Sequence, residues 1–281
     1  MAGYRYVVCD VFTDTPLSGN PLAVFTDARG IPEQLLQPLA RELSLSETVF
    51  VLPASGDAHA RIRIFTPRVE LPFAGHPTLG AAFVLGGPLQ LHEIRLETAA
   101  GVVPVRLERE GARIVFGWMR QPLASVARYR HERQLLDALG VSSSELPVEA
   151  YDNGMVNVYV CLRSAEDVAA LAPDMAGLAR LPDVIGINTI AGCGTAWKTR
   201  MFAPAAGVVE DAATGSAAGP LAVHLLRHGR IVPGQEIEIV QGAEIGRPSK
   251  LYARVEGSPQ AVEAVEVGGS AVIVARGEFR L

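Results

Sequence analysis

The stretch that decides the fold is RIFTPRVELPFAGHPTLGAA, residues 63–82. A run of β-forming residues passes through a loop rich in glycine and proline into the apolar stretch AAFVLGG at residues 81–87. This pattern predicts a strand, a loop that carries His76, and a helix from about Thr78 to Leu85. A lone histidine is usually structural, but the flanking glycine and proline make a functional role equally plausible.

The second half of the chain contains a similar stretch, RMFAPAAGVVEDAATGSAAG, at residues 200–219. Arg63 matches Arg200, since the first begins RIFTP and the second begins RMFAP. At nearly the same distance further on, TLGAA at Thr78 matches TGSAA at Thr214. Chance similarity of two strand-loop-helix segments stays possible. Three matched features in the same order favour an internal duplication.

The duplication predicts two similar domains, residues 1–120 and 121–281, and the last strand can cross back to the first domain. Two such domains leave a cleft, and ligand sites favour domain interfaces. If the two helices begin facing each other, their free N–H groups converge on one point and form an anion site.

Composition excludes several classes of protein. The chain has 281 residues, 49% hydrophobic and 20% charged, and a net charge of −5, which favours folded domains and argues against nucleic-acid binding. No apolar run is long enough to predict a membrane span, and the N-terminus lacks a signal-peptide pattern. The three cysteines are far apart in sequence and indicate a reducing compartment without disulfides. We therefore expect a cytoplasmic protein.

Acidic residues near the matched stretches are candidates for chemistry. Asp211 and Thr214 come just before the second helix, where a helix cap and a functional role are equally plausible. Gly215 and Ser216 lie where backbone N–H groups are free. Glu47 precedes an apolar strand, and the sequence alone favours an exposed strand-end carboxylate. In a closed cleft, burial would raise the pKa of Glu47 and suit it to proton transfer.

Other patterns are weaker. His224 and His228 have the spacing of two metal ligands on a helix, but the segment HLLRH lacks the glutamate of HExxH, so a surface helix explains it better. No phosphate-binding motif or cysteine ligand cluster is present in the sequence. Cys193 has no partner signal, which argues against a racemase with two thiols. We expect neither a metal nor a cofactor.

Taken together, the motifs resemble the PhzF-like family of phenazine-biosynthesis-type isomerases. The segments that carry the resemblance cover nearly the whole chain. They are DVFTDTPLSGNPLAVF (10–25), LSETVFV (45–51), FTPRVELPFAGHPTLGAA (65–82), RMFAPAAGVVEDAATGSAAG (200–219) and QGAEIGRPS (241–249). The resemblance implies an α+β fold of the diaminopimelate-epimerase type. In that fold, two pseudo-symmetric domains each wrap a curved, mostly antiparallel, barrel-like sheet around a central helix. It also implies a homodimer and proton transfer without a cofactor.

The resemblance also implies roles for individual residues. In the phenazine branch of the family, the glutamate of the SET motif moves a proton along a dihydro-hydroxyanthranilate, and Glu47 matches it. His76 and Asp211 match the family's other catalytic positions. Ala212 stands where many relatives have proline. The remaining expected substrate contacts are Asn20, Ser46, Gly75, Thr214, Gly215 and Ser216.

We therefore predict an isomerase that shifts a proton and a double bond on a small carboxylated ring or amino acid, as in secondary metabolism. Two other hypotheses remain: an amino-acid epimerase or racemase, and a non-catalytic carboxylate-binding protein. A racemase needs bases on both faces of the substrate, and one carboxylate without a thiol pair argues against it. The shared site pattern does not identify the substrate.

Overall fold

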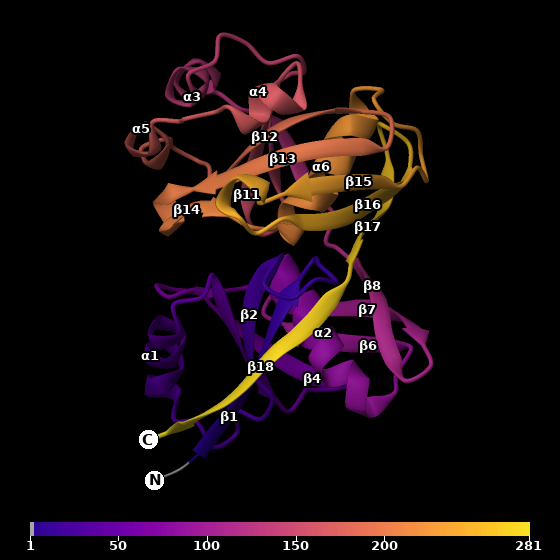
Figure 1. Ribbon diagram of the computed structural model, residues 1–281. Coiled ribbons are helices and arrows are strands. Elements are labelled where there is room, and N and C mark those ends of the chain that lie inside the picture. Colours follow the sequence, from indigo (N-terminus) through magenta and orange to yellow (C-terminus); the bar gives the residue numbers. More distant parts are fainter. Residues whose placement is uncertain (1–2) are drawn as a thin grey trace. The chain divides into compact units, whose positions relative to one another are not determined.

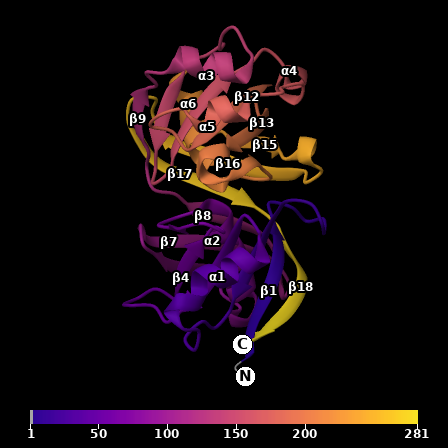
Figure 2. The same ribbon diagram turned by 90° about the vertical axis from the view of Figure 1, so that its left-hand side faces the viewer.

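The computed structural model describes residues 3–281, and their contacts divide the chain into two compact units. Unit 1 consists of the chain up to residue 120 together with residues 268–281, and unit 2 consists of residues 121–267. The last strand thus belongs to unit 1 (Figures 1 and 2).

Unit 1 is a curved sheet with two helices. Its elements are β1 (Gly3–Val11), β2 (Asn20–Phe25), α1 (Glu33–Leu43), β3 (Glu47–Leu52), β4 (Ala60–Phe65), β5 (Glu70–Leu71), α2 (Gly75–Leu89), β6 (Glu93–Thr98), β7 (Gly101–Glu110), β8 (Arg113–Arg120) and β18 (Ala271–Arg280). Pairing runs in the order β18, β1, β2, β3, β4, β6, β7, β8, and all pairs are antiparallel except β2–β3 and β4–β6.

The sheet of unit 1 wraps around α2, which contacts strands on both sides of the curve (Figure 1). Because α2 is apolar on all faces, burial on every side is its stable environment. Gly80 lets the helix lie close to the sheet, since a Cβ there would come within 2.6 Å of Leu22 Cδ2 and 2.8 Å of Val11 Cγ2. The helix start is thereby held against the ends of β1 and β2.

Unit 2 contains a second curved sheet. Its elements are β9 (Ser125–Arg128), α3 (Glu132–Leu139), β10 (Glu149–Asp152), β11 (Val156–Cys161), α4 (Ala165–Ala169), α5 (Met175–Ala179), β12 (Gly186–Cys193), β13 (Ala196–Ala203), η1 (Pro204–Ala206), β14 (Val208–Asp211), α6 (Gly215–Arg227), β15 (Ile237–Gln241), η2 (Ala243–Ile245), β16 (Ser249–Gly257) and β17 (Val262–Gly269). The helix α6 is buried along nearly its whole length and contacts β11 and β16. The short helices α3, α4 and α5 lie outside the sheet (Figure 2).

The two units share one order of strand pairings. In unit 1 the successive pairings of β1, β2, β3, β4 and β6 are antiparallel, parallel, antiparallel and parallel. In unit 2 those of β10, β11, β12, β13 and β15 follow the same order. The fold class expected from the family resemblance is confirmed: each unit has a curved, mostly antiparallel sheet around a central helix.

The matched arginines have matched environments. Arg63 binds the carboxylate of Glu70 and lies 5.1 Å from the centre of the Phe65 ring. Arg200 binds the carboxylate of Glu210 in the same way, with its guanidinium 5.0 Å from the Phe202 ring. Glu210 is therefore a structural ion-pair partner, and the duplication extends to side-chain contacts.

The matched helices require a correction to the sequence alignment. The helix α2 begins at Gly75 and α6 begins at Gly215, so the structural counterpart of Gly215 is Gly75 and that of Ser216 is His76. The pairing of Thr78 with Thr214 is wrong. Small residues recur throughout both helix starts, so their pattern alone does not determine the register.

Candidate functional site

His76 lies in the first turn of α2, where sequence analysis predicted a loop. The residue before the helix, Ala74, is extended, with φ −150° and ψ 140°, and Gly75 is the first helical residue. Pro77 does not prevent this early start, because the first amides of a helix have no intrahelical acceptor and a missing N–H costs nothing there. The early start buries His76, which is 3% exposed.

Four polar side chains from three segments of unit 1 meet at this helix start. Asn20 is the first residue of β2 and Glu47 the first residue of β3, and the parallel pairing places both at the same end of the sheet. Asn20 Nδ2 lies 3.3 Å from His76 Nδ1, and Ser46 Oγ donates to Asn20 Oδ1 at 2.7 Å. The result is a chain of contacts from Ser46 through Asn20 to His76.

The orientation of the Asn20 amide determines where the His76 proton lies. With Oδ1 accepting from Ser46, the NH₂ group faces Nδ1, which must then act as the acceptor. The proton of the neutral ring is therefore on Nε2. His76 Nε2 lies 3.3 Å from Glu47 Oε2, without the alignment of a hydrogen bond. Such contacts often tighten only when substrate binds.

Burial determines the charge of His76. It lowers the pKa of the imidazole from its ordinary 6.5 to about 3, because a charged ring would lose its hydration. His76 is therefore neutral near pH 7. The adjoining carboxylate of Glu47 is also mostly buried, with a side chain 15% exposed. The expectation of an exposed strand-end carboxylate at Glu47 is wrong in this fold.

Asp211 anchors the loop that leads into α6 in unit 2. Its Oδ2 accepts from Thr214 Oγ1 at 2.6 Å, and its Oδ1 accepts from the Ala212 N–H at 3.1 Å. A proline at position 212 could not make the second contact. Thr214 is the N-cap residue of α6, but its side chain makes no cap hydrogen bond and instead donates to Asp211. Capping by Thr214 is thus ruled out.

Gln241 holds this loop from the neighbouring strand. Its Oε1 accepts from the Thr214 N–H at 3.1 Å, and its Nε2 donates to the Asp211 carbonyl at 2.9 Å and to Thr214 Oγ1 at 3.0 Å. Gln241 is 1% exposed, so these bonds are shielded from water. Sequence reasoning gave this residue no role, although it opens one of the family-like motifs.

The first turn of α6 carries an unusual set of side-chain hydrogen bonds to its carbonyl groups. Gln121 donates to the Gly215 carbonyl at 2.7 Å, Asn153 to the Ser216 carbonyl at 2.9 Å, and Tyr159 to the Ala217 carbonyl at 2.7 Å. Pro220 explains the second of these, because it has no N–H to offer the carbonyl four residues earlier. These bonds fix the position of the helix start.

Both central helices present backbone N–H groups at their starts. The first amides of α2, at Gly75 and His76, and those of α6, at Gly215 and Ser216, have no intrahelical acceptor. The helix dipole adds a partial positive charge at the same point. Each helix start can therefore bind an anionic group such as a carboxylate.

Comparisons with known proteins assign the chain to a family. The sequence profile of the family described as phenazine biosynthesis-like protein (PhzC-PhzF) matches residues 9–277. The chain belongs to this family. It is 51% identical to a trans-2,3-dihydro-3-hydroxyanthranilate isomerase of Pseudomonas aeruginosa, with 99% of this chain and 100% of that protein covered. A Pseudomonas fluorescens protein of the same name is 48% identical over the same coverage.

Solved structures of the phenazine biosynthesis-like family have the same fold. A PhzF-family protein of Bacillus anthracis superposes with a TM-score of 0.86 at 25% identity, covering 100% of both chains. A hydroxyproline epimerase from Agrobacterium vitis superposes with a TM-score of 0.68 at 15% identity, with 99% of this chain and 91% of that one covered, and shows the fold alone. The family assignment made from the motifs is confirmed, and the chain is an isomerase of this family.

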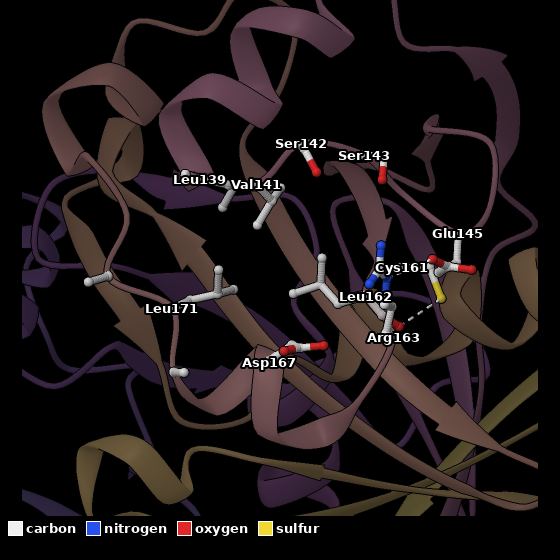
Figure 3. A pocket seen from close by; sticks show the side chains of 13 residues that line it. Leu139, Val141, Ser142, Ser143, Glu145, Cys161, Leu162, Arg163, Asp167 and Leu171 are labelled. Atoms are coloured by element: carbon white, nitrogen blue, oxygen red, sulfur yellow. Dashed lines mark hydrogen bonds and ion pairs between the residues drawn. The ribbon is translucent and has the colours of Figure 1, made fainter.

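An open cavity lies elsewhere in unit 2 and contains no member of the site expected from the family (Figure 3). It has a volume of about 580 Å³, and its lining includes Ser142, Ser143, Cys161, Arg163 and Asp167. Arg163 and Glu145 at its edge form only an exposed ion pair of 3.6 Å. The cavity therefore does not replace the helix starts as the candidate site.

Two expectations about the whole chain can be compared with the structure. Within residues 3–281 no helix is long and apolar enough to cross a membrane. The cysteines are free thiols: Cys9 and Cys161 are buried, and Cys193 is exposed. Burial raises the pKa of the Cys9 thiol to about 12 and that of Cys161 to about 11. Neither buried thiol is therefore suited to act as a base near pH 7.

Proposed function

We propose that this isomerase moves a proton, and with it a double bond, on trans-2,3-dihydro-3-hydroxyanthranilate or a similar small carboxylated ring. Three Pseudomonas relatives named for that reaction are 51%, 48% and 49% identical to this chain over 99% of its length. The observation that carries the proposal is the approach of His76 Nε2 to Glu47 Oε2, 3.3 Å apart and mostly buried at the start of α2.

Glu47 acts as the acid and base in this proposal. Its carboxylate takes a proton from one substrate carbon, the electron pair of that C–H bond becomes part of the shifted double bond, and the proton returns to a second carbon. The formula of the substrate is unchanged, so the step needs no external oxidant or reductant. Neutral His76 presents Nε2–H beside the carboxylate, and this contact tightens to a donated hydrogen bond when substrate binds, which stabilises the charged form of Glu47.

The helix starts bind the polar groups of the substrate. The N–H groups of Gly75, Gly215 and Ser216 suit a carboxylate, and the Asp211 carboxylate suits an amine or hydroxyl hydrogen. Asn20, Ser46 and Thr214 were expected to contact substrate. Because the side chain of Asn20 contacts His76, that of Ser46 donates to Asn20 and that of Thr214 donates to Asp211, we propose that they position those groups.

The proposal extends to the state of the protein in the cell. We propose a cytoplasmic homodimer, on the basis of the family resemblance and of the three free cysteines, which suit a reducing compartment. Light scattering of the purified chain tests the dimer, and a monomer mass at micromolar concentration would contradict it.

Replacing Glu47 tests the chemistry. In Glu47→Gln the side chain keeps its shape but cannot accept a proton, so we expect turnover to fall by at least about 10²-fold. Substrate affinity, measured by calorimetry, should change little, because Glu47 is not assigned to the binding of the carboxylate. Reactions in D₂O report proton transfer separately, through deuterium at one carbon of the product.

Glu42→Gln is the matched control, since Glu42 is an exposed glutamate on α1. It should retain wild-type turnover. Near wild-type turnover in Glu47→Gln would overturn the proposed role. Tight binding without turnover or deuterium exchange in the wild-type chain would instead favour a carboxylate-binding protein. Inversion at one carbon without a double-bond shift would favour an epimerase.

A further inference from the structure

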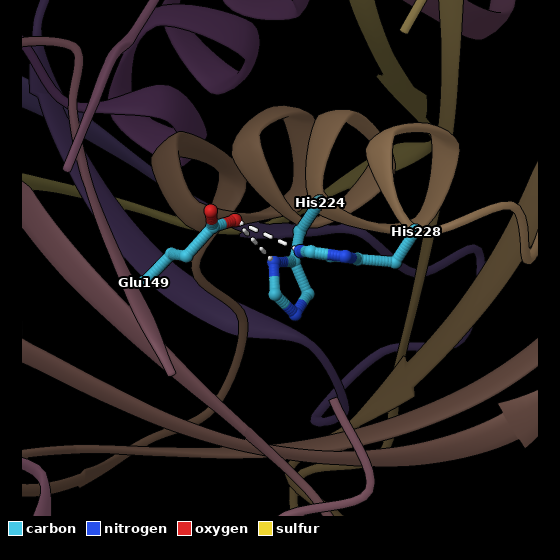
Figure 4. Close-up of side chains that lie close together, drawn as sticks. All are labelled: Glu149, His224 and His228. Carbon is cyan, nitrogen blue, oxygen red and sulfur yellow. Dashed lines mark hydrogen bonds and ion pairs between the residues drawn. The ribbon is translucent and has the colours of Figure 1, made fainter. Parts of the chain in front are cut away.

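A second cluster of titratable groups lies in unit 2, at the opposite end of α6 from Asp211. His224 is in the last turn of α6 and His228 follows directly as its C-cap residue. Glu149, the first residue of β10, points at both rings (Figure 4). None of these residues has a role in the proposed isomerisation.

The cluster is not the surface feature that sequence analysis expected. The side chain of His224 is fully buried, while those of Glu149 and His228 are 14% and 20% exposed. The helix α6 is the central helix of unit 2, so its histidines face the protein rather than solvent. A surface helix as the explanation of the HLLRH spacing is wrong.

The distances bring three potential ligand atoms together. Glu149 Oε2 lies 3.4 Å from His224 Nδ1 and 2.9 Å from His228 Nε2, and the three atoms all lie within 4.8 Å of one another. Zinc bonds to histidine nitrogen and carboxylate oxygen are about 2.0–2.2 Å, so two ligands of a tetrahedral ion lie roughly 3.4 Å apart. The cluster is therefore close to the size that such an ion requires.

The chemistry of the three groups selects the class of ion. Two imidazoles and one carboxylate form a ligand set suited to Zn²⁺ and its transition-metal neighbours, whereas Mg²⁺ and Ca²⁺ prefer oxygen ligands. Two histidines four residues apart lie on one face of a helix and can reach the same ion. The carboxyl end of a helix also favours positive charge through its dipole.

The neighbours of Glu149 are compatible with this role. Tyr151 OH donates to Glu149 Oε2 at 2.8 Å, and ligating carboxylates are commonly held by such hydrogen bonds. Arg227 approaches the other oxygen, Oε1, at 3.4 Å. Oε2 faces both histidines as well as Tyr151 OH, which also lies 3.1 Å from His224 Nδ1. Because His228 and Glu149 are partly exposed, an ion and a water as fourth ligand can reach the cluster from solvent.

We propose that Glu149, His224 and His228 bind one divalent transition-metal ion of the Zn²⁺ class. The ion links the end of α6 to β10 and so holds the helix whose other end carries Gly215 and Ser216. The proposal does not depend on the proposed isomerisation, and it requires no change in that reaction.

The test is Zn²⁺ binding to the full-length chain, freed of any affinity tag and treated with chelator. Calorimetry should show one Zn²⁺ per chain. Co²⁺ bound in place of Zn²⁺ should give the visible absorption of an ion in a low-symmetry site. His228→Gln and Glu149→Gln should each weaken Zn²⁺ binding by at least roughly tenfold. Gln at position 228 can still donate to Glu149, so we expect the variant to fold. Its thermal unfolding temperature, measured without metal, checks this expectation.

His92→Gln is the control, because His92 is an exposed histidine of unit 1. His92→Gln should bind Zn²⁺ as the wild-type chain does. Zn²⁺ should raise the unfolding temperature of the wild-type chain and of His92→Gln but not that of His228→Gln. Absence of one-to-one binding in the wild-type chain would overturn the proposal. Equal binding in His228→Gln and wild type would do the same, since the ion would then lie elsewhere.

Discussion

Asn20 makes the largest difference at the scale of single residues, because it determines the tautomer of His76. Its NH₂ group faces Nδ1, and this places the proton of the ring on Nε2, next to Glu47. The sequence motif around Asn20 suggested a substrate contact. The structure instead buries Asn20, which is 1% exposed, between Ser46 and His76.

Substitutions of Asn20 test this positioning role. Asn20→Ala should lower kcat by at least about 10-fold with little change in KM, since the ring loses its fixed tautomer but the substrate loses no contact. Asn20→Asp has nearly the same shape, but its carboxylate accepts a hydrogen bond from Nδ1–H and so favours the tautomer without a proton on Nε2. We therefore expect Asn20→Asp to be no more active than Asn20→Ala. Higher activity in Asn20→Asp would indicate a role in shape alone.

The buried state of His76 also predicts a pH dependence of stability. The folded-state pKa is about 3 and the ordinary value is 6.5, so between these values the unfolded chain binds a proton that the folded chain does not. The free energy of unfolding should therefore be fully retained above pH 6.5 and fall as the pH drops toward 3. The loss is up to about 1.4 kcal/mol per pH unit.

Denaturant unfolding of the wild-type chain and of His76→Gln at pH 7 and pH 5 measures this effect. The free energy of unfolding should fall by about 2 kcal/mol more in the wild-type chain than in the variant, as an upper value. Titrating groups that do not contact residue 76 cancel in the comparison. Equal losses of the free energy of unfolding in the two proteins would show that His76 has the same charge in the folded and the unfolded chain between pH 7 and pH 5.

At the scale of elements, the first turn of α6 depends on side chains from outside the helix. Pro220 leaves the Ser216 carbonyl without its usual intrahelical donor, and Asn153 supplies the hydrogen bond at 2.9 Å. The Ala217 carbonyl differs, because it can receive the Leu221 N–H as well as the Tyr159 hydroxyl.

This difference predicts unequal losses of stability. Asn153→Ala should lower the free energy of unfolding by about 1–3 kcal/mol, because it leaves a buried carbonyl unsatisfied. Tyr159→Phe should cost only about 0.5–1.5 kcal/mol, since it removes one of two donors. Thermal or denaturant unfolding measures both. A larger loss for Tyr159→Phe than for Asn153→Ala would contradict the explanation through Pro220.

The starts of the two central helices show where local sequence signals fail. Glycine and proline around His76 predicted a loop, yet α2 begins at Gly75. The signals fail because proline is tolerated in a first helical turn, where its missing N–H has no acceptor to lose. The strand β9 was also not predicted from the sequence. It is an element of only four residues, and its pairing with β10 is its main support.

At the scale of the whole molecule, the duplication is visible in the sequence because both copies keep the same side-chain contacts and the same kind of central helix. An arginine that pairs with a glutamate and stacks on a phenylalanine recurs as Arg63 and Arg200. Each copy also needs a small-residue helix apolar on all sides to fill its curved sheet. These requirements leave a pattern in sequence, and the motifs around them carried the family assignment.

The sequence by itself determined the duplicated strand-loop-helix segments, the presence of two central helices and the family, because hydrophobic periodicity and short motifs are local properties of the chain. Only the tertiary structure decided that Asn20, Glu47 and His76 meet within 3.3 Å, that Gln241 holds the Asp211 loop, and that His224 is buried beside Glu149. These contacts join segments far apart in sequence. Their geometry depends on strand register and on the first residue of each helix, and both are determined by packing of the whole unit.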